Sequence, residues 1–478
     1  MMRRQVYRAG GLRRRALAAA VMVVAAAPAA AQGPVIEKVA PPEWWIGHSI
    51  NPVRVMVRGR ALDGARFACG RLRCTRATTS ASGTTSFVDV TVPAGLAPGT
   101  YPITVQTAAG RRSFEFTVSR RLATTGRFRG VGPDDVLYLA MPDRFANGDP
   151  GNDDPAKAPG LHDRTKARSY HGGDLAGLQR RLPYLKALGI TAIWINPIYD
   201  NDDRVNGSEV AAGEAATAYH GYHTRDYYGV DEHFGDTATF RAFVDAAHAQ
   251  GIKVVLDMVA NHTGPGHPWV ADPPTPTWFN GTKTSHLANV WQTWTLADPH
   301  ATPAMRRSTL DGWFVDLLPD LNQDDPETRR YLIQNTLWWV EKFGLDGIRQ
   351  DTWPYVPRTF WRDWMAAIKA ARPGVTVVGE VFEGDPSLVS FFEGGRRQWD
   401  GLDTGVDQLF DFPLFFASRS AFARGKPVRE VAQTLGRDHL YRDASRLVTF
   451  LGLHDVDRFM HEPGATAEGL MLAFTFQL

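Results

Sequence analysis

The chain has 478 residues, a length that allows about three domains of roughly 150 residues each, although a single barrel can absorb about 250. Its formal net charge of +2 comes from 53 basic and 51 acidic side chains. A balance this small excludes the strongly basic surface with which proteins bind nucleic acid or anionic membranes, and we expect neutral partners.

Residues 1–31 are typical of a secretory signal peptide and are left out of the fold. Six arginines precede an Ala/Val-rich run from Ala16 to Ala27 and the small residues 29–31. The apolar run is shorter than the roughly 20 residues of a membrane-spanning helix. We therefore predict an exported protein, periplasmic or extracellular, with the general and the twin-arginine route both open. Without these residues, 47 basic and 51 acidic side chains remain, a net charge of −4.

The next part of the chain, residues 32–121, has the pattern of a small β-sandwich. Apolar and polar residues alternate in four segments, which are Val53–Val57, Phe87–Val92, Tyr101–Val105 and Phe114–Val118. Turn signals rich in proline and glycine separate them. Trp44 and Trp45 could stack on a sugar, or pack in a core or interface. Residues 122–133 read as a linker.

Cys69 and Cys74 are the only cysteines. In an exported chain this pair favours a disulfide that closes a small loop in the N-terminal module. The alternative is two unrelated thiols. A metal site is disfavoured because no further cysteine or nearby histidine completes it.

From residue 134 to 478, apolar runs alternate with helical stretches, which indicates a parallel sheet closed by crossovers. We expect seven strands, near 136–142, 190–195, 253–259, 346–350, 375–379, 406–411 and 447–452. The Pro- and Trp-rich stretch at about 264–325 is too long for a simple loop. Only some twenty residues follow the last strand, so we expect a barrel truncated after strand seven.

Four of these apolar runs end in polar side chains. The segments are Val254–His262, Gly347–Asp351, Val377–Val381 and Val448–Asp455. Polar residues at the carboxyl ends of parallel strands gather at the mouth of an α/β sheet or barrel. Carboxylates beside buried strands must be desolvated. Three acids, an arginine and two histidines delivered in this way indicate an active site.

These segments resemble, in this order, the α-amylase family of glycoside hydrolases. Its motifs run D-x-x-x-N-H, G-x-R-x-D, an apolar pair before G-E, and a closing H-D, and all four occur here. Gly189–Pro197 and Leu318–Asn322 resemble further segments of that family. The likeness implies a TIM (β/α)8-type barrel with a subdomain inserted after the third strand. The N-terminal module resembles the immunoglobulin-like module of cyclomaltodextrinases and neopullulanases, which also implies a homodimer formed through it.

The resemblance implies a role for each site residue. Asp351 matches the nucleophile, Glu380 the acid/base, and Asp455 the side chain that steadies the distorted sugar. The implied substrate-binding residues are Tyr222, His262, Arg349 and His454. Arg349 lies two residues before Asp351, on the same strand face, so we expect its charge to keep Asp351 ionised. Apolar neighbours of Glu380 are expected to keep it protonated toward neutral pH.

A second polar run suits a hard cation, because short oxygen-bearing side chains are dense in it and Ca²⁺ takes about 6–8 oxygen ligands. It resembles a calcium loop of neopullulanase-like enzymes. The likeness implies structural Ca²⁺ held by Asn147, Asp149, Asn152, Asp153, Asp174 and the carbonyl of Gly172. The alternative is an Asx-rich turn without metal.

The chain departs from the family pattern in three places. Leu453 stands where Asn is common, while Gln350 and the pair Trp353-Pro354 are unusual near the nucleophile. We leave the acceptor-side subsites unassigned. The predicted activity is hydrolysis of α-1,4-glucosidic bonds in maltodextrins, cyclodextrins or pullulan, with retention. The alternatives are a catalytically silent, truncated carbohydrate-binding barrel and a transglycosylase on the same site.

Overall fold

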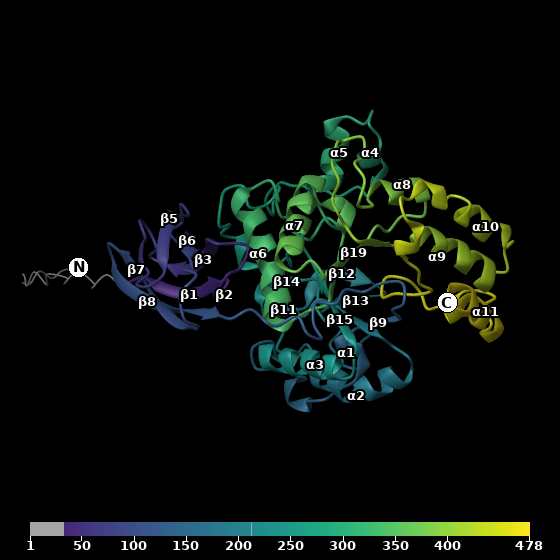
Figure 1. Ribbon diagram of the computed structural model, residues 1–478, viewed down its shortest axis with the longest axis horizontal. Helices are drawn as coiled ribbons and strands as arrows, with labels where there is room; N and C mark the ends of the chain where they lie inside the picture. Colours follow the sequence, from purple (N-terminus) through teal and green to yellow (C-terminus); the bar gives the residue numbers. More distant parts are fainter. Residues whose placement is uncertain (1–32, 212) are drawn as a thin grey trace, which may run out of the picture.

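The computed structural model describes residues 33–211 and 213–478 (Figure 1). The predicted signal peptide lies outside the described residues. The N-terminal strands gather at one end of the long axis of the molecule, and the last helices of the chain lie at the other end (Figure 1). Within the described ranges, none of the helices is both long and apolar enough to cross a membrane.

The N-terminal module is a sandwich of two four-stranded sheets, with the orders β1-β3-β6-β5 and β2-β8-β7-β4. The bounds are β1 Val35–Ala40, β2 Glu43–Trp45, β3 Val53–Arg60, β4 Arg66–Ala68, β5 Arg73–Thr79, β6 Thr85–Thr91, β7 Gly99–Thr107 and β8 Gly110–Ser119. The four strands predicted from alternation are confirmed as β3, β6, β7 and β8. Trp44 and Trp45 are both buried, which favours packing over sugar stacking.

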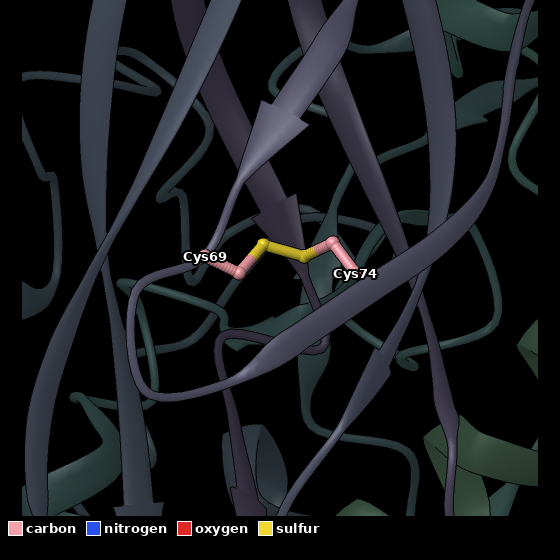
Figure 2. Close-up of a disulfide and its surroundings, with 2 residues drawn as sticks. All are labelled: Cys69 and Cys74. Atoms are coloured by element: carbon pink, nitrogen blue, oxygen red, sulfur yellow. A yellow bond between two sulfur atoms is a disulfide. The ribbon is translucent and has the colours of Figure 1, made fainter.

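The predicted disulfide between Cys69 and Cys74 is confirmed (Figure 2). Cys69 follows β4 directly and Cys74 lies in β5, and these two strands belong to different sheets. The bridge therefore joins the two layers of the sandwich at one edge.

The second body is built on a seven-stranded parallel sheet with the order β21-β20-β19-β18-β15-β10-β9. The bounds are β9 Leu137–Ala140, β10 Ala192–Ile195, β15 Lys253–Met258, β18 Gly347–Gln350, β19 Thr376–Gly379, β20 Gln408–Phe410 and β21 Leu447–Val448. Every predicted strand is present. β21 is shorter than expected, because Phe450 leaves the sheet and stacks on Phe415.

Helices and short ribbons connect these strands. The helices are α1 Pro142–Phe145, α2 Leu175–Ala187, α3 Thr237–Ala249, α4 Trp294–Ala297, α5 Pro303–Leu310, α6 Pro326–Phe343, α7 Arg358–Ala371, α8 Pro386–Phe391, α9 Phe412–Ser418, α10 Arg429–Leu435 and α11 Ala467–Gln477. The ribbons are formed by β11 Tyr199–Asn201, β12 Asn206–Ala211, β13 Glu214–Ala216, β14 Thr224–Val230, β16 Leu287–Ala288 and β17 Gly312–Trp313. The domain bounds 32–121, 122–133, 134–478 and 264–325 stay predictions.

Local sequence explains where several of these elements start. Pro142 begins α1, where its missing N–H costs nothing, and this ends β9 before the predicted residue 142. The Asp325 carboxylate accepts the N–H groups of Glu327 and Thr328, which caps α6. In α7 the apolar side chains recur at helical spacing and are buried.

The sandwich is joined to the barrel through α6. Arg54 of β3 is buried, and its guanidinium contacts the Glu327 carboxylate at 2.6 Å and Asp89 at 3.3 Å. The Gln334 side chain bonds both the N–H and the C=O of Arg54, at 2.8 and 2.7 Å. A buried charge with several partners fixes the relative position of the two bodies.

Candidate active site

Arg349 lies at the centre of the predicted catalytic residues. Its Nη1 donates to Asp351 Oδ1 at 2.7 Å, and its Nη2 lies 2.5 Å from Glu380 Oε1. Asp351 follows β18 and Glu380 follows β19, so parallel neighbours bring the two carboxyl groups to one edge of the sheet. All three side chains are buried. The structure thus brings together the residues that the sequence motifs predicted.

Asp257 completes this group, although no role was assigned to it from the sequence motifs. It lies on β15 directly opposite Arg349 in the register of the sheet, and both of its oxygens accept from Arg349 Nη1, at 3.0 and 3.1 Å. Trp194 Nε1 donates to it at 3.0 Å. Asp257 is the first residue of D-x-x-x-N-H, so the signal for it was present in the motif.

Tyr222 spans from Asp257 to His454. Its hydroxyl donates to Asp257 Oδ2 at 2.8 Å and lies 2.9 Å from His454 Nε2, and its ring stacks on the imidazole. Gly221 makes this position possible, because it has a φ of 91° and a Cβ there would lie 2.0 Å from the Pro197 carbonyl oxygen.

The two predicted histidines are placed differently. Burial lowers the pKa of His262 to about 3 and that of His454 to about 4, so both are neutral near neutral pH. His454 contacts Asp455, whose side chain is 44% exposed, at 3.1 Å. The Nε2 atom of His262 is buried without a partner among the described residues, which leaves it free for a substrate hydroxyl.

The pKa values of the two central carboxyl groups differ. Burial raises the pKa of Asp351 to about 6, although the Arg349 cation lowers it. Burial raises the pKa of Glu380 to about 8, again against Arg349. Arg349 acts in the direction that the sequence predicted, since its charge lowers the pKa of Asp351, but burial raises that pKa by more. The order is still the one a reaction needs near pH 7, with Asp351 ionised and Glu380 protonated.

The residue after Asp351 has an unusual backbone. Thr352 has φ 50° and ψ 40°, a left-handed conformation that a β-branched side chain rarely adopts. Its N–H donates to Glu380 Oε2 at 3.0 Å. The unusual backbone therefore aims a donor at the predicted acid/base. Trp353, next along the chain, is buried and stacks on Trp361 at 4.2 Å, so it serves packing.

The predicted calcium loop is partly assembled. Asn147 Nδ2 donates to Asp153 Oδ1 at 2.7 Å, and a Cβ at Gly172 would lie 2.5 Å from that same oxygen. The Asn152 side-chain oxygen is buried without a partner among the described residues. Because exchanging the amide N and O of Asn147 would present an oxygen, these groups fit a hard cation.

The other two residues of the predicted set already bind backbone groups. Asp149 accepts from the N–H of Gly151 at 2.9 Å. Asp174 caps α2 by accepting from Gly177, and its carboxylate also accepts from the N–H groups of Gly148 and Asp149. These bonds fix the shape of the loop.

Comparison with known proteins identifies the family. Residues 139–474 match the α-amylase catalytic domain, and residues 38–122 match the cyclomaltodextrinase N-terminal domain. Neopullulanase 2 of Thermoactinomyces vulgaris is 32% identical over 350 residues, which cover 72% of this chain and 54% of that protein. A cyclomaltodextrinase of Geobacillus thermopakistaniensis is 31% identical over 350 residues, which cover 72% of this chain and 53% of that protein. The chain thus spans about half the length of the curated relatives it matches.

Solved structures agree with this result. A cyclomaltodextrin glucanotransferase with a three-domain ABC distribution superposes with a TM-score of 0.60 and 31% identity, over 72% of this chain and 69% of that one. An α-amylase of Anoxybacillus superposes with a TM-score of 0.57 and 31% sequence identity, over 72% of this chain and 65% of that one. The chain therefore belongs to the α-amylase family of glycoside hydrolases, and its fold is the TIM-barrel fold of that family with an N-terminal all-β domain.

Proposed function

We propose that the chain hydrolyses α-1,4-glucosidic bonds of maltodextrins, cyclodextrins or pullulan with retention at the anomeric carbon. One observation carries the proposal. Two buried carboxyl groups, Asp351 and Glu380, contact the same Arg349 guanidinium at 2.7 and 2.5 Å. Burial raises the pKa of Glu380 further than that of Asp351, which favours an ionised and a protonated acid side by side.

The first step uses both acids. The Asp351 carboxylate attacks the anomeric carbon while Glu380 gives its proton to the departing glycosidic oxygen, so the C–O bond breaks and a glycosyl ester forms on Asp351. In the second step the Glu380 carboxylate takes a proton from water, and the resulting oxygen attacks the same carbon and releases Asp351. The sugar leaves with its original anomeric configuration.

The remaining side chains hold the sugar. Tyr222 offers an aromatic ring to the apolar C–H face of a pyranose. His262 and His454 are neutral and donate N–H to its hydroxyls, and Asp455 accepts from them. Arg349 keeps the two carboxyl groups in place and favours the anionic form of Asp351.

Product analysis tests this function. The chain is incubated with γ-cyclodextrin, pullulan and soluble starch, beside Asp351→Asn and Glu380→Gln. We expect short α-anomeric sugars from the unchanged chain only, and the preferred substrate names the subtype. New glycosidic bonds in the products would indicate a transglycosylase. Activity that survives in both variants would contradict the assignment, and no product from a folded chain would favour a binding role.

Three further properties belong to the proposal. A structural Ca²⁺ held by Asn147, Asn152, Asp153 and the Gly172 carbonyl, with Asp149 and Asp174, would brace the loop after β9. Export rests on the signal-like residues 1–31, and sequencing the N-terminus of the mature protein tests it. A homodimer through the N-terminal module rests on the match to relatives, and the solution mass from light scattering tests it.

A further inference from the structure

Three metal-ligating side chains meet outside the catalytic residues. Glu209 lies on β12, while His220 and His223 lie two residues before and one after Tyr222. One carboxylate oxygen and one nitrogen of each imidazole lie within 4.8 Å of one another. In the closest pair, His223 Nε2 and Glu209 Oε2 are 3.0 Å apart.

Both imidazoles have nitrogens without partners. His223 is 2% exposed, and its Nδ1 finds no hydrogen-bond partner among the described residues. The Nε2 atom of His220 is also buried and unpartnered there. Because Glu209 accepts from His223 Nε2 and the Tyr222 N–H donates to His220 Nδ1, the unpartnered atoms are a lone pair on His223 Nδ1 and an N–H at His220 Nε2. A metal bound by His220 Nε2 would move that proton to Nδ1. We propose that Glu209, His220 and His223 bind a divalent transition metal of the zinc class.

The ligand types favour this class over Ca²⁺. Imidazole suits Zn²⁺ and its neighbours, whereas Ca²⁺ takes oxygen ligands. A site with two histidines and one glutamate leaves a fourth position open. Cys69 and Cys74 are bonded to each other, so no thiolate in the described residues competes.

The surroundings of Glu209 set the expected affinity. Arg168 pairs with its other oxygen, Oε1, which leaves Oε2 for a metal and orients the carboxylate. The Arg168 charge also repels a cation. With bonds of about 2.0–2.2 Å, two ligand atoms on a tetrahedral metal lie roughly 3.4 Å apart, so any pair in the cluster that is farther apart must move closer. We therefore expect a dissociation constant in the micromolar range, weaker than that of a structural zinc site.

Metal binding also acts on Tyr222. The N–H of Tyr222 donates to His220 Nδ1 at 3.1 Å. A neutral imidazole has a single lone pair, so His220 cannot accept this hydrogen bond and bind a metal at once. The metal therefore competes with the bond that holds the Tyr222 backbone, and it should inhibit the reaction. This consequence, unlike the metal site itself, rests on the proposed function.

A titration with the metal alone tests the site. The untagged protein is freed of metal by chelation and placed in excess CaCl₂ to fill hard-cation sites. ZnCl₂ is then titrated by calorimetry, and CoCl₂ by visible absorption. We expect one equivalent of Zn²⁺ and the intense Co²⁺ bands of a four-coordinate site. Glu209→Gln and His223→Gln should weaken binding about tenfold or more. His439→Gln, at an exposed histidine whose Nδ1 bonds the Gly436 carbonyl, should not change it.

Two results would overturn the site: no saturable Zn²⁺ binding, or equal binding by Glu209→Gln. Glu209 is half-buried on an outer ribbon, so that variant keeps the test valid if His223→Gln does not fold by circular dichroism. In the activity assay, Zn²⁺ should slow hydrolysis by the unchanged chain and not by Glu209→Gln. A chain that hydrolyses nothing would count against the proposed function, while the titration would still decide the metal site.

Discussion

Asp257 and Arg349 lie opposite each other on adjacent parallel strands, and one guanidinium nitrogen donates to both carboxylate oxygens. Asp257 is fully buried. A carboxylate in this position needs several donors, and Tyr222 and Trp194 supply the others. The pair therefore orients the guanidinium before any substrate arrives.

Replacing Asp257 tests this orienting role. In Asp257→Asn we expect kcat to fall by about 100-fold, because Arg349 and Tyr222 lose a shared charged partner. The charge of Asp257 raises the pKa of Asp351, and burial raises the pKa of Asp257 itself to about 7, so the two carboxyl groups titrate together. Without the Asp257 carboxyl group the acidic limb of the pH profile should move to lower pH. Steady-state kinetics against pH measures both. Asp363→Asn at the surface is the matched control. If the acidic limb of the Asp257→Asn profile does not shift, Asp257 does not act on the pKa of Asp351.

The pH dependence of kcat/KM should be bell-shaped. Asp351 must be ionised to attack, so activity falls as the pH drops below about 6. Glu380 must be protonated to assist the leaving group, so activity falls as the pH rises above about 8. Outside this window the rate should change about tenfold per pH unit. A profile that stays flat from pH 6 to pH 9 would show that Glu380 is not the proton donor.

The contact between the sandwich and α6 should contribute strongly to stability. Arg54→Met removes the cation that contacts Glu327 at 2.6 Å and one of the cations near the buried Asp89, which keeps Arg330 at 3.4 Å. We expect the free energy of unfolding to fall by about 3–5 kcal/mol. Arg60→Met removes an exposed pair with Glu37 and should cost less than about 1 kcal/mol. Urea unfolding followed by tryptophan fluorescence compares them, and equal losses would mean that the junction is not rigid.

Removal of calcium should destabilise the loop after β9. After dialysis against a chelator we expect a lower melting temperature, and Ca²⁺ should restore it because binding to the folded state alone stabilises that state. Asp153→Asn should remove this response. A melting temperature that changes neither with the chelator nor with Ca²⁺ would favour the alternative, an Asx-rich turn without metal.

Local pattern predicted the strands and the catalytic pair, because each depends on short segments. Apolar runs mark buried strands, and polar residues such as Glu380 fall at their ends wherever the fold places them. The Arg54–Gln334 contact was not predictable in this way, since its residues are 280 positions apart. The cluster of Glu209 with His223 depends on how an outer ribbon folds back. The pKa of Asp351 depends on how deeply the folded chain buries this side chain, and that depth cannot be calculated from the sequence alone.

The bridge between Cys69 and Cys74 has a counterpart at the other side of the sandwich. The edge strands β5 and β4 are joined by the disulfide, while β1 and β2, at the opposite edges of the same two sheets, are joined by only residues 41–42. The two sheets are thus connected covalently at both edges, and the sandwich forms a closed covalent ring, here called the sleeve. Amide hydrogens in its inner strands should exchange with solvent only when the whole sleeve unfolds, and reduction of the disulfide should open an earlier route.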